Sequence, residues 1–394
     1  MGIGLADLFA DANYEMALAV LPLFLTAGLG APAFAVGVVE GVADGSSALI
    51  KVLSGWYSDR TRFRKGIATT GYAVTVAGFA AFALIGAWPQ AILARAFGWM
   101  GRGLRQPIRS AMLAGSVERV DLGKAFGFHE AMDTLGALAG PAIAYFVLAT
   151  QGQRSFRTIF EIALVPGVLC VLVFALRTRD PRQRRAQTPA DPQGASAGPA
   201  RDWVPLPAGF WRFLTAVAVF GAGNFAPAFL ILRAAAMLKP EFGAAQSAAG
   251  GVAFFLAYNA VGTAAAYPGG WLADRFGAPQ VVAGGYALFG AACLAGIIFS
   301  GILGVAVLAL LAGTSAPLVT AQENAVAGEL VEERFRGTGY GVLAGVNGAG
   351  DLISSIVTGA LWSAVGSWAG LGYGLVLSLA GAALLLGLRP ARSR

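Results

Sequence analysis

Ionisable residues recur at helical spacing inside stretches of this sequence that are otherwise apolar. Residues three, four or seven apart share one face of a helix. The sets with such spacing are Asp11 and Glu15; Glu40, Asp44 and Lys51; Arg102, Arg105 and Arg109; and His129 with Asp133, beside Glu130. A buried carboxyl group takes up a proton when it loses an arginine neighbour, and it releases the proton when that neighbour returns. These sets therefore have the chemistry of a proton relay.

The elements that must position these residues are membrane helices. Of the 394 residues, 57% are hydrophobic, only 12% are charged and 55 are glycine, a composition with too little charge to cover a soluble globule. About 20 apolar residues cross the roughly 30 Å of a bilayer's hydrocarbon core. Twelve such segments are predicted, at 5–28, 33–57, 66–87, 89–114, 123–149, 157–176, 208–237, 246–273, 279–301, 303–327, 337–363 and 367–388. The expected fold is an all-α membrane protein.

A short motif occurs twice, as GWYSDR at 55–60 and GWLADR at 270–275, 215 residues apart. Each copy falls where one apolar segment ends, so it predicts a charged turn at equivalent places in two halves. We expect six-helix bundles over 1–176 and 208–394. The segment 177–207 between them is rich in arginine and then in Pro, Ala, Gly and Ser, which predicts a cytoplasmic linker.

The repeated motif resembles the Gly-x-x-x-Asp-Arg signature of the major facilitator superfamily, and twelve spans with a central linker match that family over essentially the full chain. The resemblance implies two pseudo-symmetric bundles that transport a solute by alternating access. It also implies that the motif braces helix ends at a gate, through Gly55, Asp59, Arg60, Gly270, Asp274 and Arg275. The first copy departs from the usual pattern at Arg62 and Phe63, and the second ends in Ala278-Pro279.

Residues 136–144 in the fifth predicted span resemble the Gly-x-x-x-Gly-Pro antiporter motif of proton-coupled exporters in the same superfamily. The match is partial, because alanine replaces the trailing glycines. Gly136 and Gly140 allow close helix approach, and Pro141 bends a helix. A plain packing seam with a kink explains the same residues, so the motif leaves a gating role and a packing role open.

The two halves differ most in their charges. At an offset near 215, Asp44 falls on Asn259 and Asp133 on Asn347. The fold therefore tolerates amides where the N-terminal half has charges, and packing alone does not require them. We expect the charges listed above to form the substrate and proton-coupling site, with Arg102 and Arg105 as partners of Asp133, Glu130 or Asp44. The C-terminal half is expected to contribute Asn224, Asn259 and Asn347 to the site and Glu323 to a gate.

Basic residues gather on one side of the predicted topology when both termini are cytoplasmic, which the positive-inside rule favours. The formal charge of +7 follows from this topology and gives no reason to expect nucleic-acid binding. The sequence has no Walker motif for ATP hydrolysis. It also has no zinc or disulfide framework, since Cys170 and Cys293 both lie in apolar spans. We therefore expect a monomeric transporter of the bacterial inner membrane, without enzymatic activity or cofactor, which exchanges a small organic molecule for protons and is solvated by lipid.

A second function stays open, the transport of a divalent metal ion or a metal chelate. Residues 127–136 are similar to a prokaryotic branch of the superfamily that includes metal-resistance permeases. Carboxylates, His129 and either Met16 or Met132 have the chemistry of metal ligands. The arginine row would repel a bare cation and favour an anionic chelate. A transport-fold sensor is disfavoured, because the sequence has no large extra soluble segment.

Overall fold

The computed structural model describes residues 1–394 except 61–62, 118–121, 179–205, 333–335 and 388–394. The described residues form helices and no strands. Helices satisfy their own backbone groups, as the interior of a bilayer requires. The α-helices are α1 (Gly2–Leu23), α2 (Ala33–Arg60), α3 (Arg64–Ala80), α4 (Trp88–Gly115), α5 (Leu122–Gln151), α6 (Phe156–Arg177), α8 (Ala208–Gly223), α9 (Ala228–Phe276), α10 (Ala278–Ile298), α11 (Gly301–Leu330), α12 (Arg336–Ala364) and α13 (Ser367–Gly387).

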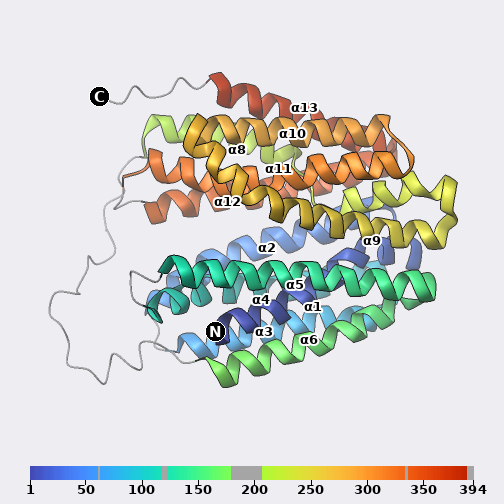
Figure 1. Cartoon of the computed structure of the whole chain (residues 1–394), viewed down its shortest axis with the longest axis horizontal. Coiled ribbons are helices and arrows are strands. Elements are labelled where there is room, and N and C mark those ends of the chain that lie inside the picture. Colours follow the sequence, from blue (N-terminus) through green and yellow to red (C-terminus); the bar gives the residue numbers. More distant parts are fainter. Residues whose placement is uncertain (61–62, 118–121, 179–205, 333–335, 388–394) are drawn as a thin grey trace.

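The helices lie in two groups that follow the order of the chain. Figure 1 shows α1 and α3 to α6 together, α8 and α10 to α13 together, and α2 and α9 between the two groups. Helix α2 packs against α4 of its own half and against α12 of the other, while α9 packs against α11 and also against α5. The start of α1 and the end of α13 lie at the same end of the molecule (Figure 1).

Each predicted span contains a helix, so the all-α membrane fold is confirmed. Within the described ranges, ten helical segments are long and apolar enough to cross a membrane, and a bent pair of helices makes up to eleven. The remaining predicted span is α4, where Arg95, Arg102, Arg105 and Arg109 lower the hydropathy. The arginines that lower the hydropathy of α4 are therefore the same residues that give this helix its ionisable groups.

One span is not continuous, contrary to the prediction of a single helix over 208–237. Helix α8 ends at Gly223, α9 begins at Ala228, and the two are bent by 40°. Helix α12 satisfies the freed backbone groups. Ser354 Oγ donates to the carbonyl oxygen of Asn224 at 3.0 Å, and the amide of Ala226 donates to Ser355 Oγ at 3.2 Å. Irregular backbone at membrane depth is tolerated where protein groups compensate it in this way.

The repeated motif was predicted to be a turn, and this is wrong. The helices continue through both copies, so that residues 55–60 form the end of α2 and residues 270–275 lie in the last turns of α9. The turn after the second copy comes at Gly277, whose φ of 94° is readily adopted by glycine. In the second copy Asp274 and Arg275 are exposed near the end of α9, where water or headgroups solvate them.

Glycine brings the backbones of α2 and α12 into contact across the two halves. A Cβ atom added to Gly359 would lie 2.9 Å from the carbonyl oxygen of Ala33, and one added to Gly37 would clash with the carbonyl oxygen of Ser355. Near the start of α2, the amide of Phe34 donates to Ser363 Oγ at 2.8 Å. The halves are therefore joined tightly at the end of α2 opposite to its charged motif.

Candidate functional site

Asp7 is the centre of a buried cluster near the start of α1. Its side chain is fully buried, and Oδ1 accepts hydrogen bonds from the Tyr72 hydroxyl at 2.5 Å and from Arg109 Nη1 at 2.6 Å. Arg105 Nη1 approaches the same oxygen at 3.3 Å, and its guanidinium carbon lies 4.3 Å from the centre of the Tyr72 ring. One carboxylate thus compensates two buried guanidinium groups, which would be costly to leave unpaired at this depth.

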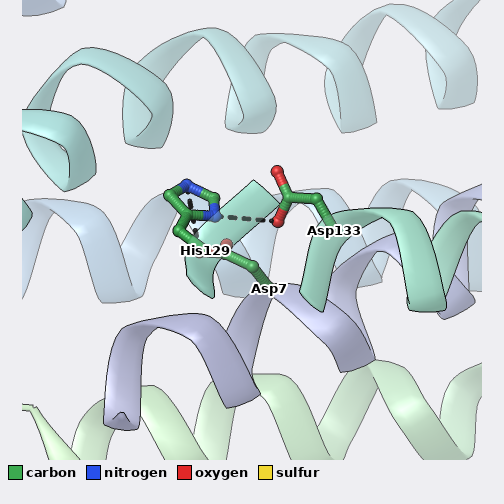
Figure 2. A group of neighbouring side chains, drawn as sticks. All are labelled: Asp7, His129 and Asp133. Atoms are coloured by element: carbon green, nitrogen blue, oxygen red, sulfur yellow. Dashed lines mark ion pairs between the residues drawn. The ribbon is translucent and has the colours of Figure 1, made fainter. Parts of the chain in front are cut away.

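His129 and Asp133, one turn apart on α5, complete this cluster, which we call the Asp7 cluster (Asp7, Tyr72, Arg105, Arg109, His129 and Asp133). Figure 2 shows the imidazole and the two carboxylates facing one another. His129 Nδ1 lies 3.1 Å from Asp133 Oδ1, and Nε2 lies 3.7 Å from Asp7 Oδ2. Arg109 Nη2 lies 3.8 Å from Asp133 Oδ2. The Asp133 side chain is 24% exposed whereas that of Asp7 is fully buried, so Asp133 is the carboxylate that water reaches.

Asp7, His129 and Asp133 also have the composition of a metal site, since one ligand atom from each lies within 4.8 Å of the others. Arg109 is close to both carboxylates, at 2.6 Å from Asp7 and 3.8 Å from Asp133. A cation placed among the three groups would face this guanidinium at short range. The arrangement therefore suits a proton, which needs one oxygen atom, better than a divalent ion.

Carboxylates continue from this cluster along α1. Asp11 and Glu15 follow Asp7 at intervals of four residues, or about 6 Å of helix each. Asp11 is buried within electrostatic range of Arg105, Arg102 and Asp133. Glu15 interacts with the side chain of Asn259 on α9, in the other half. The line of carboxylates leads from the end of the bundle to the contact between the halves.

A second group of charges lies where α2 faces α4. Arg95 Nη2 pairs with Glu40 Oε2 at 2.6 Å, with both side chains buried, and its guanidinium carbon lies 3.7 Å from the centre of a Trp99 ring. Trp99 Nε1 donates to Asp44 Oδ1 at 2.7 Å. The ring compensates the cation electrostatically and its N–H group binds the carboxylate, so Trp99 orients both charges.

Arg102 and Lys51 lie beside this second group. Arg102 is held by aromatic rings, with its guanidinium carbon 4.9 Å from the centre of the Tyr14 ring and 4.7 Å from that of a Trp99 ring. Arg102 Nη2 also donates to the Tyr14 hydroxyl at 3.4 Å. Lys51 is within electrostatic range of Asp44 and of Asp351 on α12. It is the lysine that bridges the charges of the two halves among the described residues.

The C-terminal half contains a smaller polar cluster around Glu323. The buried carboxylate accepts hydrogen bonds from the Tyr286 hydroxyl at 2.6 Å and from Asn347 Nδ2 at 2.8 Å. These residues tie α10, α11 and α12 together inside one half. Among the described residues the hydrogen-bond partners of Glu323 are a phenol and an amide, so a gate salt bridge of this residue stays a prediction.

A cavity of about 210 Å³ lies in the C-terminal half, whose residues line it together with Asp44 of α2. The broken span lines it with Asn224 and Phe225, and α9 adds Tyr258. Asp44 of α2 and Asp351 of α12 face it from opposite halves. The predicted site residues Asp44 and Asn224 thus meet in one space, while Asn259 lies nearby, with Nδ2 3.4 Å from the carbonyl oxygen of Ala137.

The structure places the residues that were predicted to form gates in different surroundings. Gly136 and Gly140 pack α5 against α1 within one half, and a Cβ atom on Gly140 would lie 2.6 Å from the carbonyl oxygen of Ala12. Pro141 lies inside α5, which continues through it. Asp274 is exposed, Gly270 has open space around it, and Arg275 lies 5.5 Å from the Trp271 ring centre. The side chains of Asp59 and Arg60 and the surroundings of Gly55 are not among the described parts of the structure. The predicted role of these three residues in bracing helix ends at a gate therefore stays a prediction.

The structure changes several expected pairings. Arg105 binds Asp7 rather than Asp133, and Arg102 binds aromatic rings rather than a carboxylate. Glu130 is exposed on α5, away from the Asp7 cluster. Two charges were missed, although spacing indicates both. Asp7 is one turn before Asp11 on α1, and Arg95 is seven residues before Arg102 on α4. The aromatic partners Tyr14, Tyr72, Trp99 and Tyr286 carry no comparable signal in the sequence.

Solved transporters share this architecture. The nucleoside transporter NupG superposes with a TM-score of 0.78 at 14% identity, over 97% of this chain and 98% of that one. The peptide transporter POT reaches 0.77 at 14% identity, over 98% and 92%. A bacterial homologue of the human lysosomal transporter Spinster, in an inward-facing and occupied conformation, reaches 0.71 at 16% identity, over 98% and 94%. At these identities the likeness shows the fold.

The sequence is also similar to those of known proteins. An uncharacterised MFS-type transporter of Methanocaldococcus jannaschii is 28% identical over 387 residues, which is 98% of this chain and 93% of that protein. An uncharacterised protein of Mycobacterium tuberculosis is 31% identical over 225 residues, 56% of this chain and 54% of that protein. The Major Facilitator Superfamily model matches residues 3–237 and 230–394. This multi-pass membrane protein is therefore a secondary transporter without enzymatic activity, and it belongs to the Major Facilitator Superfamily.

Proposed function

We propose that this protein is a proton-coupled antiporter that exports a small organic molecule across the bacterial inner membrane. In this proposal it works as a monomer, its termini are cytoplasmic, and bundles over 1–176 and 208–394 move about the linker between them. The observation that carries the proposal is the contrast between the two carboxylates of the Asp7 cluster. Oδ1 of the buried Asp7 accepts from a hydroxyl and from two guanidinium groups, whereas Asp133 is partly exposed between an imidazole and a guanidinium.

Asp133 and Asp7 have different roles in this mechanism. Asp7 serves as the fixed partner of Arg105 and Arg109, because both arginines and the Tyr72 hydroxyl donate to its Oδ1. Asp133 alternates between pairing with Arg109 and taking up a proton, since its 3.8 Å distance from Arg109 is loose enough to break with a small helix movement. His129, at 3.1 Å, passes the proton to or from Asp133. Asp11 and Glu15 extend the path toward the other half.

The contacts between the halves support an inward-facing state under this topology. Helix α2 touches α12 from Phe34, at the extracytoplasmic end of α2, to Ala48, whose side chain faces Gly348. The partly exposed Asp133 lies toward the opposite, cytoplasmic end, where it exchanges protons with cytoplasmic water. Movement of the halves that opens the α2–α12 contact would expose the cavity to the other side, as alternating access requires.

The proposal is tested with purified protein, first by a ligand-stabilisation screen and then by flux. The screen compares organic cations, organic anions, divalent metals and metal chelates at two pH values, because a ligand that binds the folded state raises its melting temperature. Stabilising compounds are then added to liposomes that contain the protein and a pH indicator. We expect compound-driven proton movement in the direction opposite to the compound. Transport of the stabilising compound without proton movement would refute the coupling.

The metal alternative is supported by one observation, the three ligand atoms of Asp7, His129 and Asp133 that lie within 4.8 Å of one another. The same screen decides it. If Zn²⁺ or Mn²⁺ alone stabilises the protein, and His129→Gln removes the effect, the ion is a substrate and Arg109 must swing away to admit it. The proton mechanism expects no stabilisation by the metals, because Arg109 lies against both carboxylates.

A further inference from the structure

The cavity of about 210 Å³ in the C-terminal half has an acidic lining. Its lining includes the carboxylates of Asp44 and Asp351, and within the described lining no lysine or arginine accompanies them. The two carboxylates come from different halves and are close enough to interact electrostatically. Trp99 binds only Oδ1 of Asp44, and within the described residues the Asp351 carboxylate has no side-chain hydrogen bond. Both therefore have free oxygen atoms to offer to a ligand.

The surrounding charges do not neutralise the cavity. Within electrostatic range of one another, the described residues supply four carboxylates and three cations, which leaves one negative charge in excess. The carboxylates are Glu15, Glu40, Asp44 and Asp351, and the cations are Lys51, Arg95 and Arg102. Glu323 adds a further negative charge to the field at Asp351. In addition, Glu15 Oε2 is buried without a hydrogen-bond partner. The site therefore has more carboxylates than cations, which suits a positively charged ligand.

The walls of the cavity indicate the body of the ligand. Phe225, Tyr258 and Phe289 line it with aromatic rings, and aromatic faces attract organic cations. Its volume of about 210 Å³ exceeds the roughly 150 Å³ of a cavity that holds benzene. Asn224 at the break between α8 and α9 adds a polar group that can orient the ligand. One aromatic ring with a short ammonium-bearing arm matches this space and charge.

We propose that the transported molecules are small monovalent organic ammonium ions, which bind with the ammonium group between Asp44 and Asp351 and the apolar body against Phe225, Tyr258 and Phe289. This inference rests on the proposed transport function and specifies its substrate class. Because one carboxylate belongs to each half, the bound cation screens the repulsion between Asp44 and Asp351. Lys51, two turns after Asp44, serves as a tethered cation that partly fills this role before the substrate binds.

Three probes with the same body and different charges test the proposal: 2-phenylethylamine, 2-phenylethanol and phenylacetate. We expect only the amine to raise the melting temperature of the purified protein. Asp44→Asn and Asp351→Asn should each raise the apparent Kd for the amine by about thirtyfold or more, the loss expected when one member of a buried charge pair is removed. Asp351→Glu, which keeps the charge, should retain most of the affinity. Glu161→Gln removes an exposed carboxylate of α6 and should change nothing.

Other outcomes overturn the assignment. Stabilisation by the alcohol or the acid as strong as that by the amine, stabilisation by none of the three, or unchanged amine affinity in both asparagine variants would each refute the ammonium site. If the asparagine variants do not fold, a protection experiment replaces them. A cysteine is introduced by Asn224→Cys in the otherwise unaltered protein, and the amine must then protect it from a thiol reagent. None of these results depends on proton movement. Failure of the substrate class and failure of proton coupling are thus distinguishable.

Discussion

Arg109 and Glu323 occupy equivalent positions in the two halves and carry opposite charges. Arg109 contacts Asp133 at 3.8 Å, Glu323 accepts a 2.8 Å hydrogen bond from Asn347, and both pairs are related by the same offset of 214 residues. Tyr72 and Tyr286 are related by this offset as well. The duplicated fold has therefore kept a polar contact between equivalent helices and changed its chemistry. The N-terminal version is an ion pair, and the C-terminal version is a neutral amide bound to a carboxylate.

Asp133→Asn should uncouple transport without preventing substrate exchange. The amide fits the same space but cannot carry a proton, so uptake driven by a pH gradient should fall by about a hundredfold, in the range of the loss of a general acid-base group. Counterflow of labelled against unlabelled substrate, which needs no net proton movement, should continue. Both are measured in liposomes with the compound found by the stability screen.

The control for Asp133 is Glu130→Gln on the same helix, which removes an exposed carboxylate and should leave gradient-driven flux unchanged. His129→Gln should slow this flux by less than Asp133→Asn does, since water can replace the imidazole at a partly exposed carboxylate. Equal gradient-driven flux in Asp133→Asn and in the unaltered protein would remove Asp133 from the coupling mechanism.

Asp7→Asn should destabilise the protein. An amide leaves Arg105 and Arg109 buried without their anion, at a cost of about 3 kcal/mol or more. The measurement is the melting temperature in detergent. The double variant Asp7→Asn with Arg109→Gln removes one uncompensated charge and should recover part of the loss. A single variant as stable as the unaltered protein would contradict the assignment of Asp7 as the fixed anion of the cluster.

The sequence predicts the helices well and their interruptions poorly. Eleven of the twelve predicted spans are unbroken within their predicted bounds, apart from irregular turns at their ends, because apolar length is a direct property of the sequence. The break between Gly223 and Ala228 was missed because it is only four residues long inside a long apolar segment, although Asn224 and Pro227 are a local signal for it. What stabilises the break is Ser354 and Ser355 on α12, about 130 residues away. Compensation by a distant helix cannot be deduced from local composition.

The sequence predicted most residues of the candidate site but few of the contacts between them. Helical spacing correctly placed His129 beside Asp133 on α5. The guanidinium that reaches Asp133 is that of Arg109, not that of the predicted Arg102 or Arg105. Helical spacing did not predict that Arg105 turns to Asp7 or that Arg102 lies against Tyr14. These choices depend on which helices touch, and a charge-based comparison of the halves gives no weight to aromatic partners.

Glu323→Gln should preserve the C-terminal half. Glutamine can accept the Tyr286 hydroxyl and, with a rotated Asn347 amide, keep the second hydrogen bond, so the melting temperature should stay close to that of the unaltered protein. Glu323→Leu leaves Tyr286 and Asn347 without partners, at a cost of about 1–3 kcal/mol for each unsatisfied group. If glutamine and leucine destabilise the protein equally, the carboxylate's charge has a role that hydrogen bonding does not explain.

Gly37→Val should weaken the closed contact between the halves. The added side chain meets the backbone of α12 at Ser355, and overpacking of this kind costs about 1–3 kcal/mol. Because the penalty applies only while α2 and α12 touch, it shifts the equilibrium toward the open state by about fivefold or more. The readout is disulfide cross-linking between cysteines introduced by Phe34→Cys and Ser363→Cys, where the native pair lies in hydrogen-bond contact at 2.8 Å.

Cross-linking isolates this contact, because the native Cys170 and Cys293 are buried and should not compete for the oxidant. Gly345→Val is the matched control on α12, since a Cβ atom there meets nothing within 4 Å. We expect the rate of cross-linking to fall in Gly37→Val and to stay unchanged in Gly345→Val. An equal rate in both would mean that the glycine contact does not hold the halves together at this end. The closure would then depend on polar contacts such as the one between Phe34 and Ser363.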